Sequence, residues 1–87
     1  MPVVALRAPL SDLAGGNRRL EVPGDNVGQI LLELERKWPR TRGWILDEHG
    51  AVRRHVNVFL DGERVDATAS VGADAVLQVL PSITGGS

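Results

Sequence analysis

One amphipathic stripe near the middle of the chain sets the strongest limit on the fold. Its apolar residues recur at helical spacing on a single face: Val27, Ile30, Leu31, Leu34 and Trp38. Asp25 or Asn26 can cap the first backbone N–H groups of this helix, and Pro39 ends it. Because one helix can cover only one face of a sheet, any sheet built from the flanking segments must keep an open face.

Five short segments around the helix have the composition of β-strands. They are residues 3–8, 19–22, 55–60, 63–65 and 75–80. The turn signal at Gly15-Gly16-Asn17 joins the first two in a predicted hairpin, and Asp61-Gly62 is a hairpin turn between the third and fourth. Pro81 limits pairing beyond the last strand, since it has no N–H to donate.

The order strand, strand, helix, strand, short strand, strand indicates an α+β chain with a β-grasp (ubiquitin-like) fold. We expect a mixed sheet of about five strands with one main helix packed on one face. Residues 1–81 should form this single domain, and residues 82–87 a flexible, free C-terminal Gly-Gly tail. Trp38 and Trp44 are expected in the core, with Trp44-Ile45-Leu46 covering one of its edges.

Size and composition exclude several classes of function. A domain of 87 residues buries only roughly 60% of the surface of its unfolded chain, which favours presenting a surface over enclosing a reaction. The net charge of −1, without long runs of either sign, points to no partner and argues against nucleic acid. There is no cysteine, no signal sequence and no apolar run that could cross a membrane, so we expect a cytoplasmic protein.

Alternation within the strands predicts what the open face carries. Val56, Val58 and Leu60 should face the helix, which turns Phe59 outward. In the last strand Gln78 marks the outward side, so Leu80 and Val76 should share that side. A group of exposed apolar side chains usually marks a partner-binding surface. The alternative is that residues 40–54 fold back over it.

The end of the chain resembles that of the ubiquitin-like sulfur carriers, the MoaD/ThiS group. In that family an apolar strand, proline, a small apolar residue and Gly-Gly close the chain, as in Leu80-Pro81-Ser82-Ile83-Thr84-Gly85-Gly86. Residues 10–17, 24–28 and 55–62 are similar to the family's first turn, helix entry and central strand. The long segment 43–54 makes the chain most like the carriers of cysteine or specialised-metabolite biosynthesis. Residues 72–75 depart from the family's usual turn.

The resemblance implies a carrier protein and not an enzyme. A ubiquitin-activating-type adenylating enzyme, using ATP and magnesium, would activate the Gly86 carboxylate, and sulfide or a persulfide would convert it to a thiocarboxylate. The thiocarboxylate would supply a biosynthetic enzyme, either cysteine-synthase-like or the molybdopterin synthase large subunit. The chain itself would bind no cofactor. Pro81, Ser82, Ile83, Thr84 and Gly85 would thread the partner's active site, and glycines suit such a narrow path.

Ser87 departs from the family pattern, because members usually end at the second glycine. Chemistry at Gly86 requires its removal, so Gly86-Ser87 is a predicted processing site, and the resemblance implies a JAMM-type metalloprotease. Alternatively, Ser87 is not native.

Other functions remain open on the sequence alone. The chain could be the small subunit of molybdopterin synthase, or a modifier conjugated to lysines through Gly86. It could also be a passive binding domain in which Gly85-Gly86-Ser87 is a mere linker. His49 and His55 have no second ligand pair nearby and are expected at the surface, so we predict no metal site.

Overall fold

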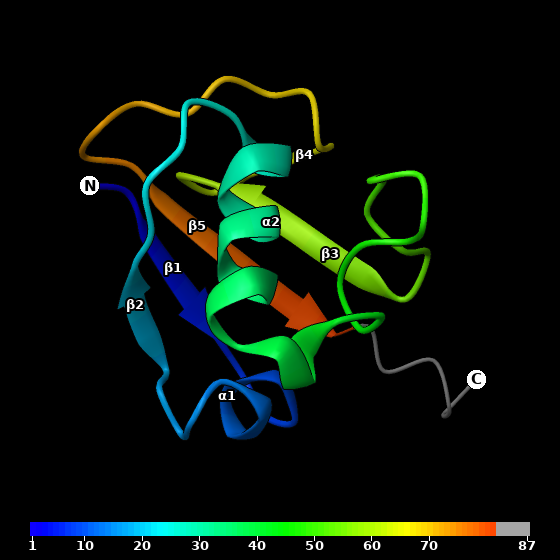
Figure 1. Cartoon of the computed structure of the whole chain (residues 1–87). Helices are drawn as coiled ribbons and strands as arrows, with labels where there is room; N and C mark the ends of the chain where they lie inside the picture. The colour runs from blue at the N-terminus through cyan, green and yellow to red at the C-terminus, as the bar shows by residue number, and fades with distance from the viewer. Residues whose placement is uncertain (82–87) are drawn as a thin grey trace.

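A single long helix lies across a five-stranded sheet (Figure 1). The computed structural model describes residues 1–81. In chain order the elements are β1 (Val3–Leu6), α1 (Leu10–Leu13), β2 (Arg19–Glu21), α2 (Val27–Lys37), the 3-10 helix η1 (Pro39–Thr41), β3 (Val56–Leu60), β4 (Glu63–Val65) and β5 (Val76–Pro81). The strand order is β2-β1-β5-β3-β4, with β1 and β5 parallel and the other pairs antiparallel. The predicted β-grasp fold is confirmed.

Helix α2 begins and ends at the predicted signals. Asn26, and not Asp25, is its N-cap, because the Asn26 side chain accepts a 2.9 Å hydrogen bond from the backbone N–H of Gln29. The helix ends at Lys37, and Pro39 starts η1 directly afterwards. Basic residues in the last turn also favour this end through the helix dipole.

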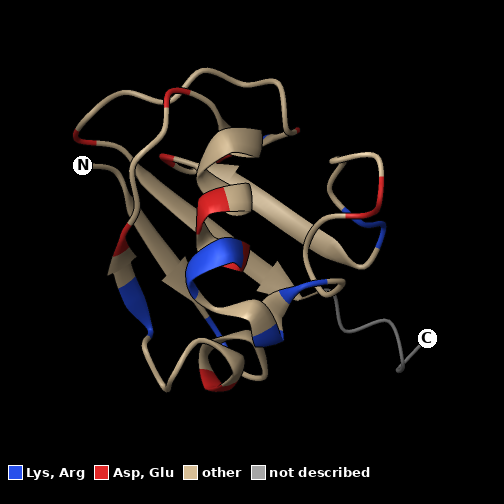
Figure 2. Cartoon of the chain, viewed as in Figure 1, with Lys and Arg blue, Asp and Glu red and all other residues tan. Residues whose placement is uncertain are grey.

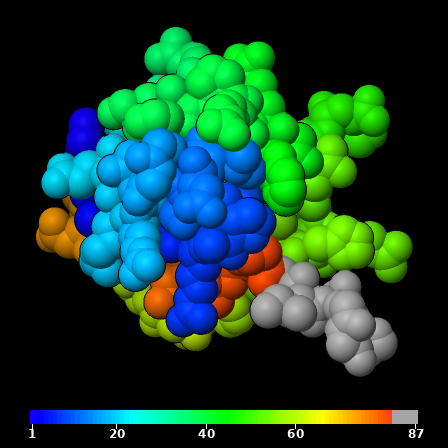
Figure 3. Space-filling view, turned by 90° about the horizontal axis from the view of Figure 1, so that it is seen from below, coloured from blue at the N-terminus to red at the C-terminus, as the bar shows by residue number. Residues whose placement is uncertain are grey.

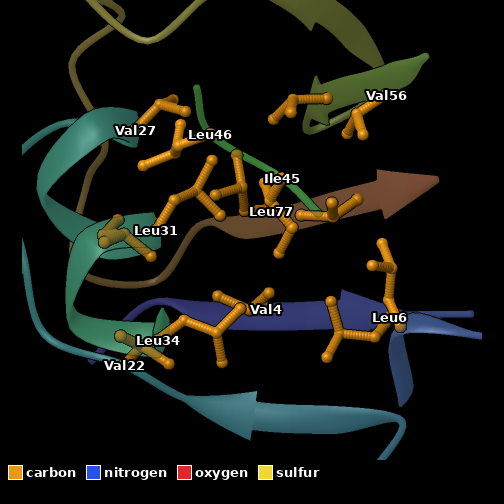
Figure 4. Packing of buried hydrophobic residues seen from close by; sticks show 14 of the residues in the cluster. Val4, Leu6, Val22, Val27, Leu31, Leu34, Ile45, Leu46, Val56 and Leu77 are labelled. Carbon is orange, nitrogen blue, oxygen red and sulfur yellow. The ribbon is translucent and has the colours of Figure 1, made fainter. Parts of the chain in front are cut away.

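The apolar stripe of α2 meets the inward-facing side chains of the sheet (Figure 4). The buried set includes Val27, Ile30, Leu31 and Leu34 from the helix and Val4, Leu6, Val56, Val58, Leu77 and Val79 from the strands. Burying one such side chain contributes about 1.5–3 kcal/mol. Trp38 is half-buried and packs against this cluster.

The segment between η1 and β3 closes the core beside the helix. Ile45 and Leu46 are buried, and the Arg53 N–H donates to the Ile45 carbonyl at 2.9 Å. Because these apolar residues pack on the helix side of the sheet, the alternative in which residues 40–54 cover the open face is wrong. Trp44 is 49% exposed, so its assignment to the core is also wrong. The backbone N–H of Trp44 donates to the Thr41 carbonyl at 3.0 Å in the turn after η1. The buried positions of this segment are therefore taken by the next two residues, Ile45 and Leu46.

The connection between β1 and β2 contains a helix that the sequence pattern did not indicate. The predicted first strand ends at Leu6, and α1 follows with Leu10 buried. Four residues are too few for helical periodicity to be visible. The two strands still pair antiparallel, as expected, with Val3 opposite Glu21. Within residues 1–81 no helix has the length and apolar character needed to span a membrane.

Candidate partner-binding face and root of the C-terminal tail

Strand β5 occupies the middle of the sheet and carries the chain toward its C-terminal end. It is held on both sides, with Val79 opposite Leu6 of β1 and Pro81 opposite Val56 of β3. Pro81 is the last residue of β5 and the last residue that the structure describes, and we call it the root of the predicted tail. The predicted tail residues Ser82, Ile83, Thr84, Gly85 and Gly86, and the processing site at Ser87, lie outside the described residues.

The three predicted surface residues lie on the same face of the sheet. Phe59 is opposite Gln78, and Val76 and Leu80 lie two residues to either side of Gln78 on β5. Since residues two apart on a strand share a face, all three side chains project away from α2. Phe59, Val76 and Leu80 are each half-buried, and together they form a small apolar group around the exposed Gln78. We call this group the open-face cluster.

Sequence reasoning missed the residues that extend this face. The register places Val3 beside Val76 and Ala5 beside Gln78, so β1 adds two half-buried apolar positions. Arg64 of β4 lies opposite Phe59 on the far side. Alternation of residues 3–6 would have indicated outward positions, but only the strand order shows that they border β5.

A side-chain contact fixes the turn at the upper end of the face. The Asp61 N–H donates to the Val76 carbonyl at 3.1 Å, and the Asp61 carboxylate accepts from the Val76 N–H at 3.2 Å. Asp61 takes a positive φ of 48°, which aspartate tolerates better than most residues. This pair joins the β3–β4 turn to the start of β5 and so fixes Phe59 relative to Val76.

The carboxyl groups with shifted pKa values lie away from the open-face cluster and have structural roles. Burial raises the pKa of Glu35, against the opposing effects of the Leu46 N–H and of Arg42 and Arg53. Hydrogen bonds from the backbone N–H groups of Ala51 and His49 lower the pKa of Asp47. The Thr68 hydroxyl and N–H lower the pKa of Asp66.

Neither of two hollows in the surface includes a residue of the open-face cluster. One, of about 830 Å³, lies along α2 and is lined by residues such as Pro23, Leu32 and Arg42. The other, of about 300 Å³, lies beside β4 between Val65 and Arg54. In residues 1–81 no three histidine or acidic side chains gather as metal ligands would, and His49 and His55 are exposed. The candidate site is therefore the open-face cluster together with the root of the tail.

Comparison with known proteins gives a consistent set of relatives. No family model matches the sequence. The sulfur carrier protein CysO of Mycobacterium tuberculosis is 28% identical over 90 residues, covering 95% of this chain and 96% of the relative. The crystal structure of SAMP1 from Haloferax volcanii is 30% identical, covers 98% of both chains and superposes with a TM-score of 0.81.

A third structure supports the fold alone. The Amycolatopsis orientalis BexX/CysO complex matches with a TM-score of 0.89 over 99% of this chain and 100% of the matched chain, at 24% identity. By name, CysO is a sulfur carrier protein and SAMP1 is a small archaeal modifier protein. With its identity to SAMP1 over nearly the whole of both chains, its strand order and its single long helix, this chain belongs to the ubiquitin-like sulfur-carrier family.

Proposed function

We propose that this protein carries sulfur as a thiocarboxylate on Gly86. The observation that carries the proposal is the position of Gly85-Gly86, which follow Pro81 by four and five residues in a relative of a named sulfur carrier. A fully extended chain covers at most about 3.6 Å per residue, so Gly86 can lie up to about 18 Å from the sheet. That reach suits a terminus that reacts inside a partner while the folded domain stays outside.

The chemistry needs partners, since a free carboxylate is a poor electrophile. After removal of Ser87 by a JAMM-type protease, the Gly86 carboxylate attacks the α-phosphorus of ATP on an adenylating enzyme that holds magnesium, and pyrophosphate leaves. Hydrogen sulfide ion then attacks the acyl carbon, AMP leaves, and the thiocarboxylate remains. A cysteine-synthase-like enzyme is the proposed acceptor in the cytoplasm. We assign the open-face cluster to docking on the adenylating enzyme, because half-buried apolar side chains on an uncovered sheet suit a transient interface.

Intact mass measurement tests this function directly. The protein should be isolated from its native host, or made together with its neighbouring genes. A species that lacks Ser87 and carries one oxygen-to-sulfur exchange is expected. A chain that still ends in Ser87, with protease, adenylating enzyme and sulfide all supplied, would point instead to a passive binding domain. Gly86→Ala should block the exchange and is the matched control.

A second function is favoured by one observation. SAMP1 of Haloferax volcanii, 30% identical, is described as a small archaeal modifier protein. As a modifier, this chain would use the same adenylate but end in an amide to a lysine. Lys37 is the only lysine of the sequence and is exposed, so chains of the modifier on itself could grow only there or at the N-terminus. Gly86-linked conjugates in cells, without thiocarboxylate, would establish this function. Nothing beyond fold supports the molybdopterin synthase subunit.

A further inference from the structure

The fold distributes the charges of the chain unevenly, although their total nearly cancels (Figure 2). Six arginines gather at the end of the sheet where β5 ends. They are Arg7, Arg18, Arg40, Arg42, Arg53 and Arg54, and all are exposed. Acidic residues also occur in these segments, Asp12 in α1 and Asp47 and Glu48 before β3, so the six arginines outnumber three acids at this end. We call this group the basic pole. At the opposite end lie five exposed acidic residues, the acidic pole: Glu21, Asp25, Asp61, Glu63 and Asp74, with Arg64 beside Glu63 in β4.

The topology explains why the basic residues meet. Arg7 directly follows the end of β1, and the carbonyl of Arg18 accepts a 2.7 Å hydrogen bond from the Leu6 N–H. Arg40 lies in η1, just beyond the C-terminal end of α2, and η1 contacts α1. Because β3 runs antiparallel to β5, the residues that precede β3 reach the same end.

The root of the tail lies within the basic pole. Pro81 is opposite Val56, and Arg53 and Arg54 are the third and second residues before Val56. Viewed from this end, the segments after β1, around η1 and before β3 surround the end of β5 (Figure 3). A surface that docks here is therefore also the surface into which the tail must enter.

Backbone contacts place the acidic residues at the other end. Glu21 is opposite Val3, which is in turn opposite Val76 at the start of β5. The Asp25 carbonyl accepts from the Val71 N–H at 2.9 Å, in the loop that leads to Asp74. Basic residues are thus in excess at the end of the sheet where β5 ends, and acidic residues are in excess at the end where β5 begins.

We propose that the basic pole docks on an acidic protein surface that surrounds the entrance for the tail on the adenylating partner. The inference rests on the proposed function. Charge complementarity of this kind raises association rates and orients the encounter, in this case with the tail toward the entrance. With at most about 18 Å between Pro81 and Gly86, the acidic surface must border the entrance closely.

A protein surface suits the basic pole better than a nucleic acid does. Binding of single strands uses aromatic side chains on which successive bases stack. Among residues 1–81 the one large aromatic side chain that is well exposed is Trp44. The arginines also come from separate segments at one end of the sheet, whereas a phosphate backbone needs a continuous basic stripe to follow.

Charge reversal tests the proposal on the full chain lacking only Ser87. Adenylation can be measured by ATP–pyrophosphate exchange with the host's adenylating enzyme. The R53E/R54E variant should show a kcat/KM about 10- to 100-fold below the wild type at low salt. The deficit should shrink in about 0.5 M salt. The matched control E63R/D74R reverses two exposed charges at the acidic pole and should stay within about twofold. R7E/R18E repeats the test from another part of the pole, with folding checked by circular dichroism.

A combined variant separates local docking from net charge. R53E/R54E/E63R/D74R restores the net charge of −1 and should remain as slow as R53E/R54E. Recovery of the wild-type rate would overturn docking by the basic pole. Docking by the basic pole would also be overturned if both R53E/R54E and R7E/R18E had the adenylation rate and salt dependence of the wild type.

Direct binding distinguishes failure of this inference from failure of the proposed function. Affinity for the adenylating enzyme without ATP should fall with salt for the wild type and should be weaker for R53E/R54E. If that pattern holds but no thiocarboxylate forms, the docking surface stands and sulfur transfer fails. If thiocarboxylate forms but R53E/R54E binds the adenylating enzyme as tightly as the wild type does, only the docking proposal fails. Saturable binding of tRNA that R53E/R54E abolishes, with adenylation unchanged, would assign the pole to nucleic acid instead.

Discussion

The buried carboxylate of Glu35 in α2 accepts a hydrogen bond from the backbone N–H of Leu46 at 3.4 Å. This contact joins the helix to the segment that closes the core before β3. Because burial disfavours the charged form, the pKa of Glu35 is raised above its ordinary value of 4.5. The desolvated carboxyl group of Glu35 therefore holds the segment around Leu46 against α2.

Replacing Glu35 should change how stability depends on pH. A raised folded-state pKa stabilises the protein fully below the unfolded value, and that contribution is lost as pH rises through the folded value. Glu35→Gln keeps an acceptor for Leu46 without the charge. Its free energy of unfolding should match the wild type at about pH 4 and exceed it at about pH 7, measured with urea.

Glu35→Ala is the contrasting variant. It leaves the Leu46 N–H without its acceptor and should lose about 1–3 kcal/mol at both pH values. A Glu35→Gln variant that is less stable than the wild type at neutral pH would show that Arg42 and Arg53 outweigh the cost of burial.

Gly15 should be sensitive to substitution, because Trp38 packs directly against it. A β-carbon at Gly15 would lie 2.7 Å from the Trp38 ring, and φ is +70° there. Gly15→Ala should therefore cost about 1–3 kcal/mol more than Gly16→Ala, whose φ is +83° but which has no atom within 4 Å of its added β-carbon. Chemical denaturation of the two variants checks this, and equal losses would mean that the ring moves aside freely.

The helix cap gives a prediction that chooses between two neighbouring residues. The Asn26 side chain accepts from the Gln29 N–H, whereas Asp25 contributes its backbone N–H to the Gln29 side chain. Asn26→Ala should therefore destabilise the fold by about 1 kcal/mol. Asp25→Ala keeps its backbone donor and should have a smaller effect. Comparable losses in thermal unfolding of the two variants would contradict Asn26 as the cap.

The sequence predicted the elements whose periodicity is long enough to read. The stripe of α2 and the alternation around Phe59 placed the core and the open face correctly. Short or irregular pieces gave no such signal, so α1 was missed and Trp44 was wrongly placed in the core. Whether Trp44, Ile45 or Leu46 is buried depends on the space between this segment and α2, which the sequence pattern does not give.

The uneven distribution of charge over the two ends of the sheet was the property least visible in the sequence. The arginines of the basic pole come from segments far apart in the sequence, which the fold brings to one end of the sheet. Arg19 and Glu21, two residues apart in β2, already lie toward opposite ends. A net charge of −1 therefore says little about the field at the root of the tail.

Phe59 gives the sharpest test of the open-face cluster. It lies opposite Gln78, whose neighbours two residues away on β5 are Val76 and Leu80, and it is the one aromatic member of the open-face cluster. Residues that dominate protein interfaces are typically central, aromatic and surrounded by partly buried neighbours. Phe59→Ala should reduce kcat/KM for adenylation by about tenfold or more, equivalent to about 1.4 kcal/mol.

The matched control removes a more exposed apolar side chain from the opposite layer. Leu32 is 56% exposed on α2, so Leu32→Ala removes an apolar surface group without touching the sheet. It should leave adenylation within about twofold of the wild type, because contacts outside an interface contribute nothing to binding. If Leu32→Ala were the more damaging change in folded protein, the partner would dock on the helical layer, and the open-face cluster would only complete the sheet.

High salt distinguishes the contribution of the basic pole from that of the open-face cluster. It should weaken the contribution of the basic pole and leave the Phe59 deficit nearly unchanged, since apolar burial is not screened.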